Sequence, residues 1–322
     1  MADRRQRRRR HARERPGPLT AIAAAGRYAP SPTGTLHLGN LRTALLAWLF
    51  ARSQEAAFIV RVEDLDTGRV RPGLAEAQLD DLAAVGLDWD GPVVRQSERL
   101  ERYDDALHRL DADGLLYSCY CTRAEIREAA SAPHGPLPEG AYPGTCRELT
   151  ARQRGERERA GRPPALRLRS CGALVAFTDR LLGEHRAVVD DLVVRRNDGA
   201  AAYNLAVVVD DTAQGVGQVV RGADLLETTA RQLHVRALLG GPDVMHAHVP
   251  LVLGPDGARL AKRHGAVTLA ERAAAGQSPL QVRSELAASV GLAEPGEQPS
   301  LDELLARFDP HALPREPTVL GA

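Results

Sequence analysis

The segment Arg27–Asn40 constrains the fold of this chain more than any other segment, because it dictates three successive backbone states. Two prolines disfavour helix at and just before their own positions, so the segment begins extended. Gly34 then permits a tight turn. From Leu41 onward, apolar residues recur at helical spacing. The sequence therefore predicts a strand, a glycine-containing loop and a helix with His37 near its N-terminus.

A helix that begins directly after such a loop can receive phosphate. Its first N–H groups have no partner within the helix, and the helix dipole places positive charge at that end. Gly39 leaves room for a ligand to approach the backbone. A purely structural joint between a strand and a helix is the alternative, since short glycine patterns are weak motifs by themselves.

The complete string resembles the first signature of class I aminoacyl-tRNA synthetases, the HIGH motif, here His37-Leu38-Gly39-Asn40. Its surroundings resemble the glutamyl branch, R-x-A-P-S-P-T-G-x-L-H-x-G, which tolerates Asn at the last position of the motif. The resemblance implies an α/β fold, namely a class I Rossmann-type parallel sheet with an inserted zinc-binding element and a short helical C-terminal part. It also implies that ATP is bound by Thr33, Gly34, His37, Gly39 and Asn40.

Lys262 is the single lysine among 42 lysines and arginines. A lysine kept where arginine serves everywhere else indicates a need for a compact, flexible ammonium. Chance survival on a surface loop is the alternative. The position resembles the second lysine of KMSKS, the second class I signature, although Arg259 and Ala261 depart from that signature. The resemblance implies that Lys262 contacts the ATP phosphates and that it and His37 are the catalytic residues.

Glutamate as a substrate would need fixed guanidinium groups for its carboxylates and an acid for its ammonium. Glu63 directly follows the predicted strand 58–62, and ligands of open α/β sheets bind at the carboxyl ends of strands. The resemblance implies that Glu63 binds the ammonium and that Tyr203 and Arg221 bind the side-chain carboxylate. Taken singly, each has a structural alternative: a strand-end cap for Glu63, a core residue for Tyr203 and a surface ion pair for Arg221.

The same resemblance assigns the substrate's carboxylate and the backbone near it to Arg27, Ala29 and Ser31. Val207 occupies a position where ordinary glutamyl-tRNA synthetases carry a polar amide. In this it is similar to the shorter paralogues that attach glutamate to queuosine in tRNA(Asp). One lost hydrogen bond would weaken glutamate binding by about 1 kcal/mol.

Cys119-x-Cys121 followed by Tyr142-x-x-x-Cys146 indicates a zinc site, because two close thiolates and a third from the far side can enclose the ion. Tyrosine is not a standard zinc ligand, so His134 or water could be the fourth, and simple packing of the cysteines is the alternative. The short paralogues resemble this pattern closely. The resemblance implies one structural Zn²⁺ held by Cys119, Cys121, Tyr142 and Cys146.

Apolar patterns predict the remaining elements. Helices are expected over 74–85, 100–110 and 225–239, a central parallel strand over 205–211 and a short edge strand over 249–253. Alternation of strands and helices favours a parallel sheet with crossover helices.

The 322 residues suffice for a sizeable core. We expect an Arg-rich disordered tail (1–25), a Rossmann-type catalytic domain (26–254) with the inserted zinc-binding element (117–150), and a KMSKS-like loop with a short helical region (255–322) but no anticodon-binding domain. The tail is either a leader without function or an arm that contacts nucleic acid.

No apolar segment predicts a signal peptide or a membrane span, so we expect a cytoplasmic protein. Its cysteines should then be free of structural disulfides, with Cys171 a small buried apolar side chain.

Together with these features, the resemblance implies an ATP-dependent ligase that uses ATP with Mg²⁺, and we expect a monomer. It would activate L-glutamate to glutamyl-adenylate without tRNA and then transfer the glutamyl group to queuosine at the wobble position of tRNA(Asp). Two alternatives stay open: a truncated glutamyl-tRNA synthetase that charges a tRNA 3′ end, and a non-catalytic paralogue that binds RNA or a partner.

Overall fold

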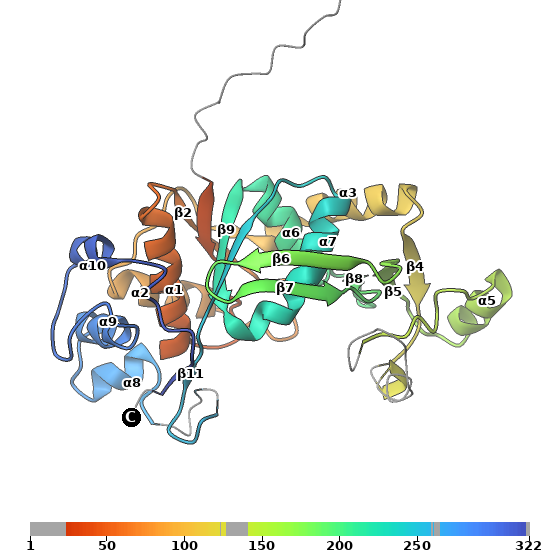
Figure 1. Cartoon of the computed structure of the whole chain (residues 1–322). Helices are drawn as coiled ribbons and strands as arrows, with labels where there is room; N and C mark the ends of the chain where they lie inside the picture. Colours follow the sequence, from red (N-terminus) through yellow and green to blue (C-terminus); the bar gives the residue numbers. More distant parts are fainter. Residues whose placement is uncertain (1–23, 123, 127–140, 259, 261–264, 320–322) are drawn as a thin grey trace, which may run out of the picture.

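The computed structural model describes residues 24–122, 124–126, 141–258, 260 and 265–319. Its centre is a sheet with the strand order β3-β2-β1-β9-β10-β6-β7 (Figure 1). All neighbouring strands pair in parallel except β6 and β7, which form an antiparallel hairpin at one edge. The strands are β1 (Ala25–Tyr28), β2 (Phe58–Val62), β3 (Val94–Arg95), β6 (Leu174–Asp179), β7 (Gly183–Val188), β9 (Val216–Gly222) and β10 (Met245–Val249).

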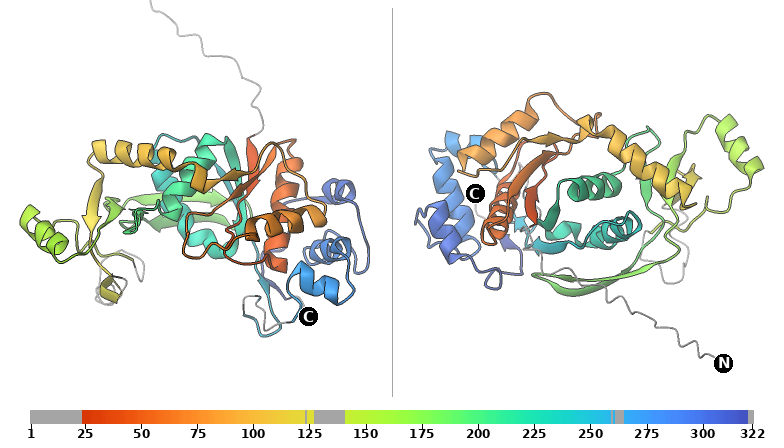
Figure 2. Two further views of the ribbon diagram at one scale, coloured as in Figure 1. Left: turned by 180° about the vertical axis from the view of Figure 1, so that it is seen from behind. Right: turned by 90° about the horizontal axis from the view of Figure 1, so that it is seen from above.

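Helices cover the sheet on two sides and create two apolar cores. Viewed from above, β1 and β2 lie between α1 on one side and α6 and α7 on the other (Figure 2). The helices of this part are α1 (Leu38–Arg52), α2 (Leu74–Ala84), α3 (Leu100–Ala112), α6 (Tyr203–Ala213) and α7 (Thr229–Leu238), with short 3₁₀ turns η1 (Gln96–Glu98) and η2 (Ala223–Thr228).

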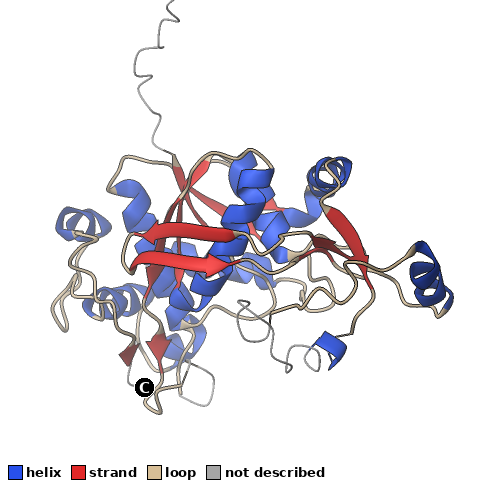
Figure 3. Ribbon diagram, turned by 45° about the vertical axis from the view of Figure 1, so that its right-hand side comes forward, coloured by secondary structure: helices blue, strands red, loops and turns tan. Residues whose placement is uncertain are grey.

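A second, smaller sheet extends from one end of the molecule (Figure 3). Its antiparallel strands are β4 (Leu116–Cys119), β5 (Ala165–Leu168) and β8 (Val193–Arg195), and α5 (Ala151–Arg159) lies beyond it with no buried residue. The predicted insertion begins within β4, but most of its middle, residues 127–140, is outside the described residues. Its boundaries and those of the other predicted domains stay predictions.

Three helices follow residue 265 and lie beside α1 in Figure 1: α8 (Leu269–Ala274), α9 (Pro279–Ala288) and α10 (Leu301–Arg307). Leu286 and Leu304 share the core that α1 forms with the sheet. A short parallel pair joins β11 (Val252–Leu253) to β12 (Thr318–Val319). Consequently α1 is packed on both of its sides, which holds its N-terminus firmly against the sheet.

Most predicted elements occur where the patterns placed them. The strand 58–62 is β2, and the helices over 74–85, 100–110 and 225–239 correspond to α2, α3 and η2 with α7. Among the described residues, no helix combines the length and the apolar character that crossing a membrane requires.

The prediction of a central strand over 205–211 is wrong, because these residues belong to helix α6. Its valines favour a strand by propensity, but tertiary packing overrides propensity here. Leu205 and Val207 are almost fully buried between neighbouring helices and strands, and a helix surrounded in this way is apolar on most of its faces. The central strand is β9 instead, whose sequence contains two glycines, a glutamine and an arginine.

The predicted edge strand 249–253 is also corrected. Val249 ends β10, an interior strand between β9 and β6, and β11 begins only after Pro250. Pro250 has no backbone N–H to donate to a neighbouring strand, which interrupts the pairing here. Its carbonyl accepts a hydrogen bond from the buried Arg42 guanidinium at 2.7 Å.

Candidate active site

A cavity of about 450 Å³ opens at the carboxyl ends of the parallel strands β1, β2, β9 and β10. It is lined by every predicted ATP- or glutamate-binding residue of the described chain, namely Arg27, Ala29, Ser31, Thr33, Gly34, His37, Gly39, Asn40, Glu63, Tyr203 and Arg221. Lys262, with Arg259 and Ala261, lies outside the described residues. The structure brings these side chains to one place, and the ligand that each one contacts stays a prediction.

His37 caps the N-terminus of α1. Its Nδ1 accepts the backbone N–H of Asn40 at 3.3 Å, and the Asn40 side-chain oxygen accepts the backbone N–H of His37 at 3.1 Å. Because Nδ1 is an acceptor in this arrangement, a neutral ring carries its proton on Nε2. Burial lowers the pKa of His37, and the nearby Asp224 carboxylate opposes that shift. A Cβ atom at Gly39 would lie 3.0 Å from the His37 ring, so glycine lets the ring occupy this position.

Arg221, the penultimate residue of β9, is 4% exposed, which excludes a surface ion pair. Four acceptors hold its guanidinium: His248 Nε2 accepts from Nε at 3.0 Å, Gln232 Oε1 from Nη1 at 2.6 Å, and Thr229 Oγ1 and the Leu225 carbonyl from Nη2 at 2.8 and 3.3 Å. A guanidinium has five N–H bonds, so these four acceptors leave one on Nη1, and the Tyr203 hydroxyl also interacts with the guanidinium.

Glu63, directly after β2, and Tyr203, the first residue of α6, line the same cavity. The Glu63 carboxylate accepts a hydrogen bond from Arg61 Nη2 at 3.1 Å. Burial raises the pKa of Glu63, and the Arg61 guanidinium opposes that rise. Tyr203 begins α6 and is 41% exposed, so its alternative role as a core residue is wrong.

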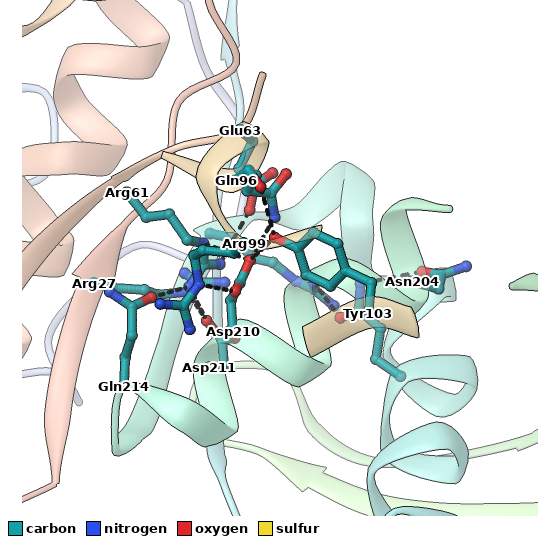
Figure 4. Close-up of polar contacts among 12 residues, drawn as sticks. Arg27, Arg61, Glu63, Gln96, Arg99, Tyr103, Asn204, Asp210, Asp211 and Gln214 are labelled. Carbon is teal, nitrogen blue, oxygen red and sulfur yellow. Dashed lines mark hydrogen bonds and ion pairs between the residues drawn. The ribbon is translucent and has the colours of Figure 1, made fainter. Parts of the chain in front are cut away.

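A buried ion network lies behind these residues (Figure 4). We define it as three guanidinium groups and three carboxylates, from Arg27, Arg61, Arg99, Glu63, Asp210 and Asp211. Arg61 is central: it donates to Asp211 at 2.7 Å, to Glu63 and to Gln214, and its own side chain is fully buried. The network balances its charges, so the carboxylate of Glu63 and the guanidinium of Arg27 can both be held at the cavity wall.

Gln96 and Tyr103 complete the network around Asp210. Gln96 Nε2 donates to the Asp210 carboxylate at 2.9 Å and the Tyr103 hydroxyl does so at 2.8 Å. Asp210 is fully buried, so these bonds and the Arg99 pair at 2.6 Å compensate for its lost hydration.

Val207 does not line the cavity. It lies one helical turn after Tyr203 and is 2% exposed within the second apolar core. The expectation that it removes a hydrogen bond to glutamate is therefore unsupported by its position.

The thiols of Cys119, Cys121 and Cys146 form a cluster in which all three sulfur atoms lie within 4.8 Å of one another. A tetrahedral zinc with Zn–S distances of about 2.3 Å separates its sulfur ligands by about 3.8 Å, so this set fits zinc. The Tyr142 hydroxyl lies 3.4 Å from Cys119 Sγ and accepts the backbone N–H of Cys146 at 2.8 Å. Hydrogen bonding from the Cys146 thiol lowers the pKa of Cys119 to about 4, which favours a thiolate.

His134, the other candidate ligand, lies outside the described residues. Cys171 is exposed, so the expectation that it is buried is wrong. It occupies a turn with φ of +51°, directly before a glycine with φ of +68°, and such a turn projects from the surface.

Several residues around the cavity were missed by the sequence analysis, among them Arg61, Asp224 and His248. The sequence signal that could have indicated the buried ion network is the Asp210-Asp211 pair. Two carboxylates that directly follow an apolar run are expected to be buried and therefore to need buried partners. The partners of Arg221 come from separate elements, which no local spacing reveals.

Residues 24–292 match the family model of the catalytic domain of class I tRNA synthetases (E and Q), and the chain belongs to this family. A relative from Nocardia farcinica (strain IFM 10152), named glutamyl-Q tRNA(Asp) synthetase, is 62% identical and covers 93% of this chain and 94% of its own. A relative of the same name from Symbiobacterium thermophilum (strain DSM 24528 / JCM 14929 / IAM 14863 / T) is 52% identical, covering 92% and 96%.

Among solved structures, a glutamate tRNA ligase from Elizabethkingia meningosepticum CCUG26117, in complex with its amino acid, aligns with a TM-score of 0.80. It is 25% identical, and the alignment covers 93% of this chain and 67% of that one.

Proposed function

We propose that this chain is an ATP-dependent ligase that activates L-glutamate to glutamyl-adenylate and transfers the glutamyl group to queuosine at the wobble position of tRNA(Asp). The observation that carries the proposal is the single cavity that joins the start of α1 to Glu63, Tyr203 and Arg221. The names of relatives at 62% and 52% identity support the same activity.

Activation is an in-line substitution at phosphorus. An oxygen of the glutamate α-carboxylate forms a bond to the α-phosphorus of ATP while the bond from that phosphorus to the pyrophosphate oxygen breaks. Both reactants are already anions, so no proton has to be removed by the protein. Positioning and charge stabilisation supply most of the rate enhancement.

His37 and the first turn of α1 would bind the ATP phosphates. The neutral His37 ring offers a donor at Nε2, and α1 has no acidic residue in its first turn to repel an anion. Lys262 would add its ammonium near the α-phosphate. Mg²⁺ would neutralise phosphate charge. Among the described residues that line the cavity, Glu63 and Asp224 are the two acids, so the ion would depend largely on ATP itself for ligands.

Glutamate would bind with its ammonium at Glu63 and its side-chain carboxylate at Arg221 and Tyr203. Arg27 would approach the substrate's carboxylate, together with the backbone near Ala29 and Ser31. Glutamine would leave the buried Arg221 facing a neutral amide, and a site of this polar kind can discriminate by factors on the order of 10⁴.

The thiol cluster would hold one structural Zn²⁺ outside this cavity, with Tyr142 beside it. We further propose that the enzyme acts as a monomer in the cytoplasm, where ATP and tRNA are available and thiols stay reduced.

An ordinary glutamyl-tRNA synthetase is the second candidate, because the solved structure with a TM-score of 0.80 is a glutamate tRNA ligase. The two candidate functions share the same fold, and they differ in the acceptor to which the glutamyl group is transferred.

The test is ATP–pyrophosphate exchange with the purified full chain in the absence of tRNA. We expect exchange that depends on L-glutamate and is far weaker with L-glutamine at equal concentration. Exchange that requires tRNA, or that is equally fast with both amino acids, would contradict the proposal.

A further inference from the structure

A buried chain of hydrogen bonds runs from β6 through β10 to Arg221 on β9. His248 Nδ1 lies 2.6 Å from Asp179 Oδ2, and His248 Nε2 accepts from Arg221 Nε at 3.0 Å. Asp179 and His248 are 1% and 0% exposed. Neither residue lines the cavity, so each can act on a ligand only through Arg221.

The protonation state of His248 follows from its two partners. A guanidinium can only donate, so Nε2 of His248 must be an acceptor. The proton of the neutral ring is therefore on Nδ1, where the Asp179 carboxylate accepts it. Burial lowers the pKa of His248, which is consistent with the neutral form. Thr229 fits the same pattern, because its hydroxyl oxygen accepts from Arg221 Nη2 at 2.8 Å while its proton can point to His248 Nε2 at 3.2 Å.

We propose that His248, oriented by Asp179, is a positioning residue that fixes the Arg221 guanidinium and thereby sets the selection of glutamate over glutamine. The proposal rests on the proposed function and deepens it.

The physical reason lies in how completely the protein holds the Arg221 guanidinium. Four of its five N–H bonds are engaged by the acceptors described above and Tyr203 interacts with it as well, so its orientation at the cavity wall is fixed. Loss of the acceptor at Nε would leave that N–H buried without a partner and allow the guanidinium to rotate about its stem. A rotated guanidinium would no longer hold its charge against the side-chain carboxylate of glutamate, so the preference for glutamate over glutamine would decrease.

His246 provides a matched control on the same strand. It precedes His248 by two residues, so it lies on the same face of β10, with its ring parallel to that of His248 and 6.0 Å away. It is similarly buried, at 4% exposure. Within the described part of the chain, it forms no hydrogen bond to Arg221.

The experiment compares His248→Asn, His248→Gln and His246→Gln in full-length protein. Asn reaches only as far as Nδ1 of the histidine, whereas Gln reaches as far as Nε2 and can still accept from Arg221. Pyrophosphate exchange gives kcat/KM for glutamate and for glutamine, and KM for ATP serves as an internal reference.

We expect His248→Asn to reduce the glutamate-to-glutamine ratio of kcat/KM by about 10-fold or more, the effect of one lost bond to a charged group. His248→Gln should restore much of the ratio, His246→Gln should keep the wild-type ratio, and KM for ATP should be unchanged throughout. An unchanged ratio in His248→Asn, an equal loss in His246→Gln, or no restoration by His248→Gln would overturn the proposal.

Thr229→Val decides the matter if His248→Asn does not fold, because it nearly preserves shape and removes one acceptor of Arg221 together with the hydroxyl contact to His248 Nε2. A reduced ratio supports the proposal and a wild-type ratio overturns it. A wild-type protein without glutamate-dependent exchange would instead refute the proposed function itself, so the two failures are distinguishable.

Discussion

Arg61 illustrates how a single residue supports the site without facing the ligand. Its guanidinium contacts Glu63 at 3.1 Å and Asp211 at 2.7 Å, and it is the fully buried centre of the ion network. Removing one charged residue from such a network lowers the free energy of unfolding, because the remaining charges stay buried without compensation.

Replacement of Arg61 by methionine, which has a similar length but no charge, should lower the free energy of unfolding by about 3–5 kcal/mol. Arg95→Met is the matched control: Arg95 pairs with Glu76 at 2.7 Å at the surface, and exposed pairs contribute about 0–1 kcal/mol. Urea unfolding of both variants measures the difference. Equal losses in the two variants would contradict the role assigned to the network.

The identities of the cavity residues could be predicted from the sequence, because the strand–loop–helix motif and the residues after β2 lie in short, recognisable strings. Their partners could not. Arg61 and Asp211 are far apart in the chain, and nothing in their local sequence reveals that they meet. Only the assembled sheet brings β2 next to α6.

At the scale of elements, the N-cap of helix α1 forms the end of the cavity at which we propose that ATP binds. The reciprocal bonds between His37 and Asn40 require an unprotonated Nδ1. The pKa of His37 in the folded protein lies below its ordinary value of about 6.5, so the unfolded chain binds this proton more readily. The stabilisation by the cap is therefore complete above pH of about 6.5 and is lost progressively as the pH falls below it.

His37→Asn tests this directly, since asparagine is a good N-cap that does not titrate. Between about pH 7 and pH 5 we expect the melting temperature of the wild type to fall more steeply than that of His37→Asn. Other buried histidines, such as His246, are common to both proteins and cancel in the comparison. Parallel melting curves across this range would show that the cap does not titrate as described.

The thiol cluster at the end of β4 gives a second prediction for an element. Three thiols within 4.8 Å should retain about one zinc per chain during purification. Elemental analysis should find no zinc in Cys119→Ser/Cys121→Ser, whereas Cys171→Ser, whose exposed thiol lies outside the cluster, should keep it. Glutamate-dependent exchange should survive zinc loss in part, because the cysteines do not line the cavity. A zinc-free wild type with full stability would assign these cysteines to packing alone.

Elements with clear periodicity, such as α2 and α3, were predictable, while α6 and β9 were not. A run of valines favours a strand by local propensity, and only the surrounding helices make it a helix. In β9, the polar side chains of Gln218 and Arg221 interrupt the apolar pattern because they donate hydrogen bonds to residues outside the sheet, Gln54 after α1 and Gln232 in α7.

At the scale of the whole molecule, the two ends differ in character. Helices α9 and α10 pack against α1 and share its apolar core, whereas α5 at the opposite end buries no residue (Figures 1 and 2). The cavity lies at the carboxyl ends of the parallel strands. Tyr203, one of its lining residues, is 41% exposed, so the cavity is open to solvent there.

The central claim concerns the acceptor, and the most direct measurement is transfer of labelled glutamate to tRNA prepared from cells with and without queuosine synthesis. The account predicts label on queuosine-containing tRNA(Asp) only. Label on tRNA(Glu), or on tRNA that lacks queuosine, would contradict it and assign the chain to the enzymes that charge a tRNA 3′ end.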